Sequence, residues 1–224
     1  VNNAIDTYKE DEIRPSEVEN IANDEDDDIY EISVEEVEIG ASNKKSSEFE
    51  EYKEADIWSV ERHHDDNIYL LDVLNYIVSV EAPIHFELLC KRVAPLFGNQ
   101  KATVKVRKGV EYILMNYKNN VIKIGDFCWD KNETDIKVRK PSESVSRPIK
   151  YIAIEELVEA MTKVLINSYG IQKEDLFVAV ARIFGFSRIG ENIKIALSKA
   201  FDKTTLAVFL PTPDNFNKSL LLSG

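Results

Sequence analysis

Two aspartates and a lysine form the group of residues in this sequence that could most readily carry out catalysis. Asp126 is followed nine residues later by Asp135, and Lys137 comes two residues after that. On a β-hairpin, two carboxylates at this spacing could hold Mg²⁺ while the lysine positions or activates a water that attacks a phosphodiester. Such nucleases need a mixed sheet of several strands, and this region predicts about two. A Mg²⁺-dependent nuclease that uses these residues is therefore a remote alternative.

The other reactive residue types form no catalytic or metal-binding pattern. Residues 63–66 read His-His-Asp-Asp, but four adjacent residues cannot all converge on one ion, so a solvated linker is expected there. No Gly-x-Ser-x-Gly motif occurs, and the 8 glycines form no phosphate-binding loop. His85 is expected at an exposed position of a helix. We expect no catalytic residue, metal site, cofactor or small-molecule substrate.

Basic side chains are the remaining candidates for a binding function. Residues 91–150 contain 14 Lys/Arg and 6 Asp/Glu, and such side chains contribute much of a protein's affinity for DNA by neutralising phosphates. The expected DNA-contacting residues are Lys101, Lys105, Arg107 and Lys108 near a third helix, Lys137, Arg139 and Lys140 on a hairpin wing, and Arg188, Asn192 and Lys194 in a second unit. The alternative is an ordinary solvated surface on a protein-interaction module.

An internal repeat indicates how these residues are positioned. Residues 84–98 and 171–185 are identical at seven of fifteen positions, at an offset of 87 residues. The apolar register continues on both sides without a gap; for example, Leu70 corresponds to Leu157 and Val110 to Leu197. This offset is too long for a solenoid period and predicts two copies of a small domain.

The spacing of apolar residues predicts three helices in each copy. The first copy has them at about 67–80, 83–97 and 102–116, with Gly98 as a left-handed cap, and the second copy at about 153–168, 172–184 and 190–202. Strand-like runs at 121–129 and 136–139, separated by a turn at 130–134, predict a hairpin in the first copy. The second copy has only a short predicted strand at 206–210.

Three helices followed by a hairpin are typical of a winged helix, whose third helix enters the major groove of DNA. We therefore expect a mainly α fold with short β-hairpin wings, of the α+β class. The predicted organisation is a disordered acidic arm or linker at 1–66, winged-helix-like units at 67–140 and 151–210, a linker at 141–150, and a tail at 211–224. The wing of the second unit is expected to be reduced.

The charge is distributed unevenly along the chain. Residues 1–66 contain 23 Asp/Glu and 6 Lys/Arg, whereas residues 67–224 contain 17 and 22. The five-acid run at 24–28 repels itself in any compact state and favours a flexible tether. The alternative is an arm that mimics nucleic acid and covers the basic surface of its own chain.

Several classes of protein are not expected. No run of about 18 apolar residues predicts a membrane span, and the first residues lack a signal pattern. Two cysteines are too few for a disulfide framework, which favours a reducing compartment such as the cytoplasm. Because the chain does not begin with Met, we expect a fragment of a longer protein.

Two sequence blocks carry a family resemblance. Residues 81–94, EAPIHFELLCKRVA, followed by Phe97-Gly98, and residues 184–190, FGFSRIG, resemble a C-terminal domain of unknown function in very large bacterial superfamily-one helicases (DUF4011/AAA-type helicase-related proteins). The resemblance covers about 68–202, but residues 99–103 depart from the Arg/Gly motif of the family.

This resemblance implies a parent protein that is an ATP-dependent helicase, whose ATPase motifs are absent from this chain. The chain itself is then no enzyme. It is expected to be an accessory module that positions duplex or forked DNA for the motor, with DNA and the helicase/ATPase domains of the parent chain as partners. The alternative is a protein–protein or intramolecular scaffold without DNA contact.

Overall fold

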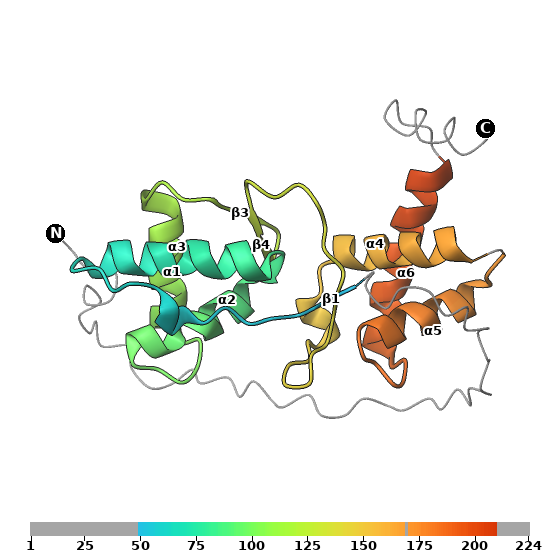
Figure 1. The fold of residues 1–224 in the computed structure, drawn as a ribbon, viewed down its shortest axis with the longest axis horizontal. Helices are drawn as coiled ribbons and strands as arrows, with labels where there is room; N and C mark the ends of the chain where they lie inside the picture. The colour runs from blue at the N-terminus through green and yellow to red at the C-terminus, as the bar shows by residue number, and fades with distance from the viewer. Residues whose placement is uncertain (1–48, 169, 210–224) are drawn as a thin grey trace, which may run out of the picture. The chain divides into compact units, whose positions relative to one another are not determined.

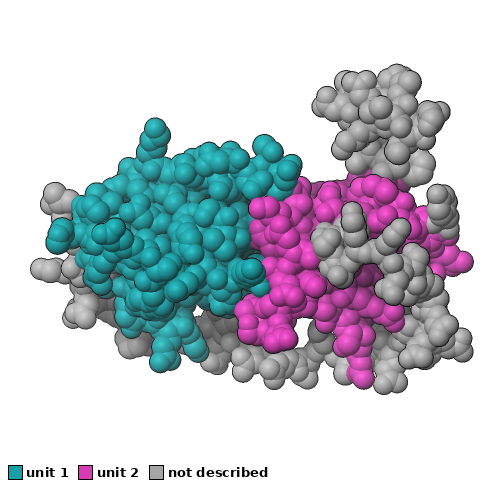
Figure 2. Space-filling model, in the orientation of Figure 1, with its two compact units in different colours: residues 1–26, 52–135, 150–153 teal, residues 27–51, 136–149, 154–224 magenta. Residues whose placement is uncertain are grey.

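The computed structural model describes residues 49–168 and 170–209, which form a mainly α fold with small sheets (Figure 1). This confirms the α+β class expected from the sequence. The described chain divides into two compact units (Figure 2). Unit 1 comprises residues 52–135 and 150–153, and unit 2 comprises residues 49–51, 136–149 and 154–209 without residue 169.

Unit 1 alternates helices with the strands of one sheet. Its elements are η1 (Ile57–Ser59), α1 (Asp66–Glu81), β2 (Ile84–His85), α2 (Phe86–Val93), η2 (Ala94–Phe97), α3 (Val104–Asn116), β3 (Val121–Ile124) and β4 (Phe127–Asp130). The sheet is antiparallel in the order β2-β4-β3. Ile84 pairs with Cys128, and Ile122 pairs with Trp129.

Polar caps set where the helices of unit 1 begin. The Asp65 side chain accepts a hydrogen bond from Asn67 N at 2.8 Å at the start of α1. Thr103 caps α3 by accepting from Val106 N at 3.4 Å. Each cap satisfies a backbone N–H that has no partner within its helix.

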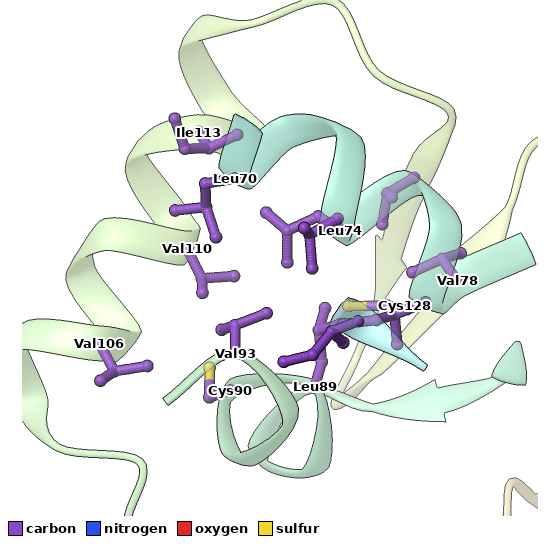
Figure 3. Close-up of a cluster of buried hydrophobic side chains, with 14 of the residues drawn as sticks. Leu70, Leu74, Val78, Leu89, Cys90, Val93, Val106, Val110, Ile113 and Cys128 are labelled. Atoms are coloured by element: carbon purple, nitrogen blue, oxygen red, sulfur yellow. The ribbon is translucent and has the colours of Figure 1, made fainter. Parts of the chain in front are cut away.

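The helices and the sheet of unit 1 enclose one apolar core (Figure 3). Leu74 from α1, Val93 from α2, Val110 from α3 and Cys128 from β4 are completely buried. Burial raises the pKa of the Cys90 and Cys128 thiols to about 12, so both thiols stay protonated inside the fold.

Unit 2 contains a second set of three helices. Its elements are β1 (Glu50–Glu51), β5 (Arg139–Lys140), α4 (Ile154–Asn167), α5 (Lys173–Ile183) and α6 (Glu191–Phe209). β1 and β5 pair in parallel. The short helix η3 (Ile149–Tyr151) follows β5 in the chain; Ile149 belongs to unit 2, and Lys150 and Tyr151 belong to unit 1. Leu157, Val180 and Leu197 are buried at the centre of the three helices.

The turn after the second helix has the same geometry in both units, 87 residues apart. Gly98 and Gly185 have φ angles of +69° and +82°, which favour glycine. In unit 1, Gly98 N donates to Pro95 O and Asn99 N donates to Ala94 O, both at 3.0 Å. In unit 2, Gly185 N donates to Arg182 O at 3.0 Å and Phe186 N to Ala181 O at 2.9 Å. The structure thus preserves the repeat found in the sequence.

Two expectations about strands are wrong. The hairpin turns at Gly125-Asp126 rather than at 130–134, so the run 121–129 forms two strands instead of one. Gly125 adopts a φ of +59°, which suits a two-residue hairpin turn. The strand predicted from Leu206 is also wrong, because residues 206–209 continue α6; Leu210 lies outside the described residues. Helix propagation adds one hydrogen bond per residue and outweighs local strand preference here.

The packed regions also extend beyond the predicted boundaries. Tyr52 and Ile57 were expected to belong to the arm, but they are buried in unit 1. Arg147 was expected in a linker, but it is buried in unit 2. Residues 1–48 of the expected arm and the expected tail at 211–224 lie outside the described residues. Among the described helices, none has the length and apolar character needed to cross a membrane.

Candidate nucleic-acid interface

α3 has one buried face and one cationic face. Val106, Val110 and Ile113 point into the core of unit 1 with no exposed surface. Because a helix repeats every 3.6 residues, Lys105 and Lys108 fall on the opposite side and are exposed. Unit 1 therefore presents this side of α3 to solvent.

Four cations around this face lack an acidic partner. Within the described parts of the chain, Lys101, Lys105, Arg107 and Lys108 have no carboxylate within 4.0 Å, in contrast to Arg92, which lies 2.7 Å from Glu54. All four side chains are exposed. Residues 99–123 contain six Lys/Arg and a single acid. The result is a local positive surface that other side chains do not neutralise.

The β3–β4 hairpin is short and tied to α2. Phe86 N donates to the backbone oxygen of Asp126 in the hairpin turn at 2.7 Å. Lys123 of β3 places its Nζ 4.0 Å from the centre of the Phe86 ring. This contact keeps an additional cation on unit 1, although Lys123 was not among the predicted contact residues. The feature of the sequence that could have identified Lys123 was its position as a lysine within a predicted strand.

The three residues predicted on the wing lie in unit 2 instead. Arg139 and Lys140 form β5, which pairs with β1, and Lys137 precedes that strand. Arg139 is 6% exposed, and its backbone N donates to Glu156 at 2.9 Å. Lys140 lies 3.7 Å from Glu51. Their assignment to a hairpin after α3 is therefore wrong, because that hairpin closes earlier, at Gly125.

The corresponding face of unit 2 is less cationic. Arg188, Asn192 and Lys194 are exposed, as expected. However, the 87-residue offset places Ile195 at the position of Lys108 and Glu191 at that of Val104. Unit 2 therefore repeats the helices of unit 1 but only two of its four cations, with Arg188 at the position of Lys101 and Lys194 at that of Arg107.

The structure does not assemble the predicted nuclease residues on one hairpin. Asp126 lies in the hairpin turn, Asp135 lies beyond the end of β4, and Lys137 belongs to unit 2. Residues 49–168 and 170–209 contain no group of three or more His, Cys, Asp or Glu side chains that could hold a metal ion. In the 63–66 segment, Asp65 instead caps α1, and its backbone N donates to His63 Nδ1 at 3.1 Å.

A buried carboxylate that the sequence analysis did not single out organises unit 1. Glu81 is fully buried and accepts hydrogen bonds from the Tyr52 hydroxyl, from Ala55 N at 2.9 Å and from Arg92 Nε at 3.2 Å. Burial and the nearby Glu81 charge raise the pKa of Tyr52. A single acid at the end of an apolar helix, eleven residues before Arg92, was the signal for this cluster.

Comparison with known proteins adds one finding. Residues 64–108 match the model of a family described as a protein of unknown function, DUF3320. The matched segment contains α1, β2, α2, η2 and the first residues of α3, and spans less than half of the chain. No curated protein and no solved structure shows a significant match to this chain.

Proposed function

We propose that unit 1 is a winged-helix-like unit that binds DNA through α3. Three helices, a tight turn at Gly98 and a hairpin follow one another in the order found in such units. In helix-turn-helix proteins the helix after the turn lies in the major groove, and in unit 1 this helix is α3. The order of elements supports the assignment of α3 as the recognition helix.

The observation that carries the proposal is the set of four exposed cations at α3 without acidic partners. A lysine or arginine that is paired with a carboxylate must break that ion pair before it binds phosphate. These four cations form no ion pair with any described residue. Phosphates can therefore approach without displacing any carboxylate of the described residues. Each neutralised phosphate releases counterions, which makes binding strongly dependent on salt.

The proposal extends to the role of the chain within a larger protein. The sequence blocks at 81–98 and 184–190 resemble a domain of bacterial superfamily-one helicases, and the first block lies within the family match. On that basis, the chain is a non-catalytic accessory module that positions duplex or forked DNA for an ATP-driven motor elsewhere in the parent protein. Its proposed location is the cytoplasm.

Exposed apolar residues favour a second function, the docking of another protein domain. Met115 of α3 is 84% exposed and Ile124 of β3 is 60% exposed. DNA interfaces are polar and positively charged, so phosphate contacts do not account for these side chains. In this alternative, the chain binds no DNA at low salt but co-purifies with the motor part of its parent.

Fluorescence anisotropy of a labelled duplex across a salt series tests the DNA proposal. For the full chain, the double substitution Lys105→Gln and Lys108→Gln should reduce the slope of log affinity against log salt by about 2, since each phosphate contact adds about 0.9. Lys140→Gln is the control, because Lys140 lies beside Glu51 in unit 2. Equal slopes for the wild type and the double variant would refute the role of α3.

A further inference from the structure

α3 carries apolar side chains on the same exposed face as its cations. Val104, Tyr112 and Met115 are 68%, 36% and 84% exposed. They alternate with lysines at helical spacing of three or four residues. We call this surface the mixed face of α3; it consists of the α3 residues Val104, Lys105, Lys108, Tyr112 and Met115 and of Lys101, which lies in the turn three residues before the helix. All three lysines precede Tyr112 and Met115 in the chain, so the first end carries the cations together with Val104 and the other end is apolar.

We propose that residues 24–34 of the same chain bind to the mixed face. This segment, which lies outside the described residues, reads DEDDDIYEISV. Five consecutive acids are followed by Ile29, Tyr30, Ile32 and Val34, so the segment also has one charged end and one apolar end. The acids pair with Lys101, Lys105 and Lys108, while the apolar residues cover Tyr112 and Met115.

The electrostatics of the two partners favour this match. The acids at 24–28 repel one another in solution, and residues 24–38 contain nine acids and no base. The lysines of the mixed face have no carboxylate within 4.0 Å among the described residues. Bringing the two together relieves both like-charge clusters without breaking an ion pair between described residues. Glu111 is the single acid among residues 99–123.

The length of chain between the two partners permits this contact. Fifteen residues separate Val34 from β1, and Tyr52, directly after β1, is held in unit 1 by its hydrogen bond to Glu81. Fifteen extended residues span about 50 Å. A unit of this size has a radius of gyration of about 12 Å, so residues 24–34 can reach any side of it.

The expected consequence is competition between the segment and DNA for the same lysines. That consequence rests on the proposed function, but the docking itself does not. If the two exclude each other, the acidic segment inhibits DNA binding. A partner or a high DNA concentration would relieve this inhibition. The docking is therefore tested in the absence of DNA.

Zero-length carbodiimide cross-linking of the full chain, read by peptide mass spectrometry, tests the docking. We expect links from the carboxylates at 24–28 to Lys101, Lys105 or Lys108 at least threefold more often than to Lys199, which is exposed in unit 2. A mixture of ¹⁴N- and ¹⁵N-labelled chains separates links within one chain from links between copies. Links distributed evenly over exposed lysines, or found only between copies, would overturn the proposal.

A matched pair of variants tests the apolar half of the contact. Tyr112→Ser with Met115→Ser leaves every lysine in place and should lower the cross-link yield at Lys105 and Lys108 at least threefold. Ile166→Ser is the control, because Ile166 is 76% exposed on α4 in unit 2. Circular dichroism checks that each variant folds. An unchanged yield in the double variant would overturn the proposal, and neither result depends on whether the chain binds DNA.

Discussion

At the scale of single residues, Glu81 joins three segments of unit 1. Its carboxylate contacts the Tyr52 hydroxyl, Ala55 N and Arg92 Nε, so the end of α1, the segment before η1 and α2 meet at one buried group. The charge is shielded from water, and a buried ion that loses its partner is costly. The cluster therefore explains why residues 52–57 belong to the packed unit rather than to a solvated arm.

Glu81→Gln is expected to destabilise unit 1 by about 3 kcal/mol, because it leaves the guanidinium of Arg92 partly buried without its main counter-charge. Glu54→Gln is the control: Glu54 also pairs with Arg92, but its side chain is 42% exposed, and its loss should cost less than about 1 kcal/mol. Urea unfolding is followed by tryptophan fluorescence, since Trp58 and Trp129 both lie in unit 1. Equal losses for the two variants would contradict this account.

His85 is expected to make the stability of unit 1 depend on pH. Its Nδ1 accepts a hydrogen bond from Glu87 N at 3.1 Å and caps α2, which requires an unprotonated Nδ1. Burial lowers the pKa of His85, against the opposing charges of Asp126 and Glu87. The unfolded chain therefore takes up a proton more readily than the folded chain as the pH falls below about 6.5, the ordinary value for histidine.

The free energy of unfolding of unit 1 should consequently be lower at pH 5 than at pH 7.5. His85→Asn keeps a side-chain acceptor at the cap but cannot titrate, so its loss of stability over the same range should be smaller. Urea unfolding at both pH values, again followed by tryptophan fluorescence, measures the difference. An identical pH dependence in the variant would show that other groups are responsible.

At the scale of elements, the sequence predicts helices better than strands. Helices α1, α3, α4 and α5 occur close to the predicted ranges, because each has a regular apolar stripe and a clear end. The hairpin was misplaced because the residues from Val121 to Trp129 are mostly apolar on both sides of Gly125, and this obscured the turn. Strands β1 and β5 contain only charged residues, so no hydrophobic pattern in the sequence predicts that they pair.

The two helix-ending turns allow a direct comparison of equivalent glycines. Alanine at position 98 is strained only by its left-handed backbone, because no atom lies within 4 Å of an added Cβ. Alanine at position 185 has the same strain, and its Cβ would also lie 2.5 Å from Pro141 Cγ. Gly98→Ala should therefore cost about 1 kcal/mol and Gly185→Ala at least about 2 kcal/mol.

Native-state hydrogen exchange measures both losses, from the amides of α2 for position 98 and of α5 for position 185. Equal losses in the two variants would mean that the Pro141 ring moves aside at little cost. That outcome would also weaken the case that the segment 141–149 is packed tightly in unit 2.

At the scale of the whole molecule, the two units share a fold plan but differ in surface charge. The repeated buried residues and turn glycines are conserved between the units at an offset of 87, whereas Lys108 is replaced by Ile195. The cationic residues of α3 could be predicted because helical periodicity separates buried from exposed positions. Those at 137–140 could not, because their placement depends on long-range strand pairing with residues 50–51.

The cationic part of this uneven charge lies on the surface of unit 1. Unit 1 presents unneutralised cations on α3, while the densest run of acids, at 24–28, lies in the part of the chain that precedes both units. The proposed DNA binding and the proposed docking of residues 24–34 both use the same helix face. We therefore propose α3 as the binding surface of the molecule.

A ¹H–¹⁵N NMR titration of the full chain with a short duplex at low salt tests this claim most directly. The amides of residues 99–108 should shift first and saturate together, and the shifts should reverse when salt is raised. The amides of the turn that precedes α6 in unit 2 should shift less. An absence of shifts at low salt, or shifts confined to unit 2, would contradict the assignment of α3 as the DNA-binding helix.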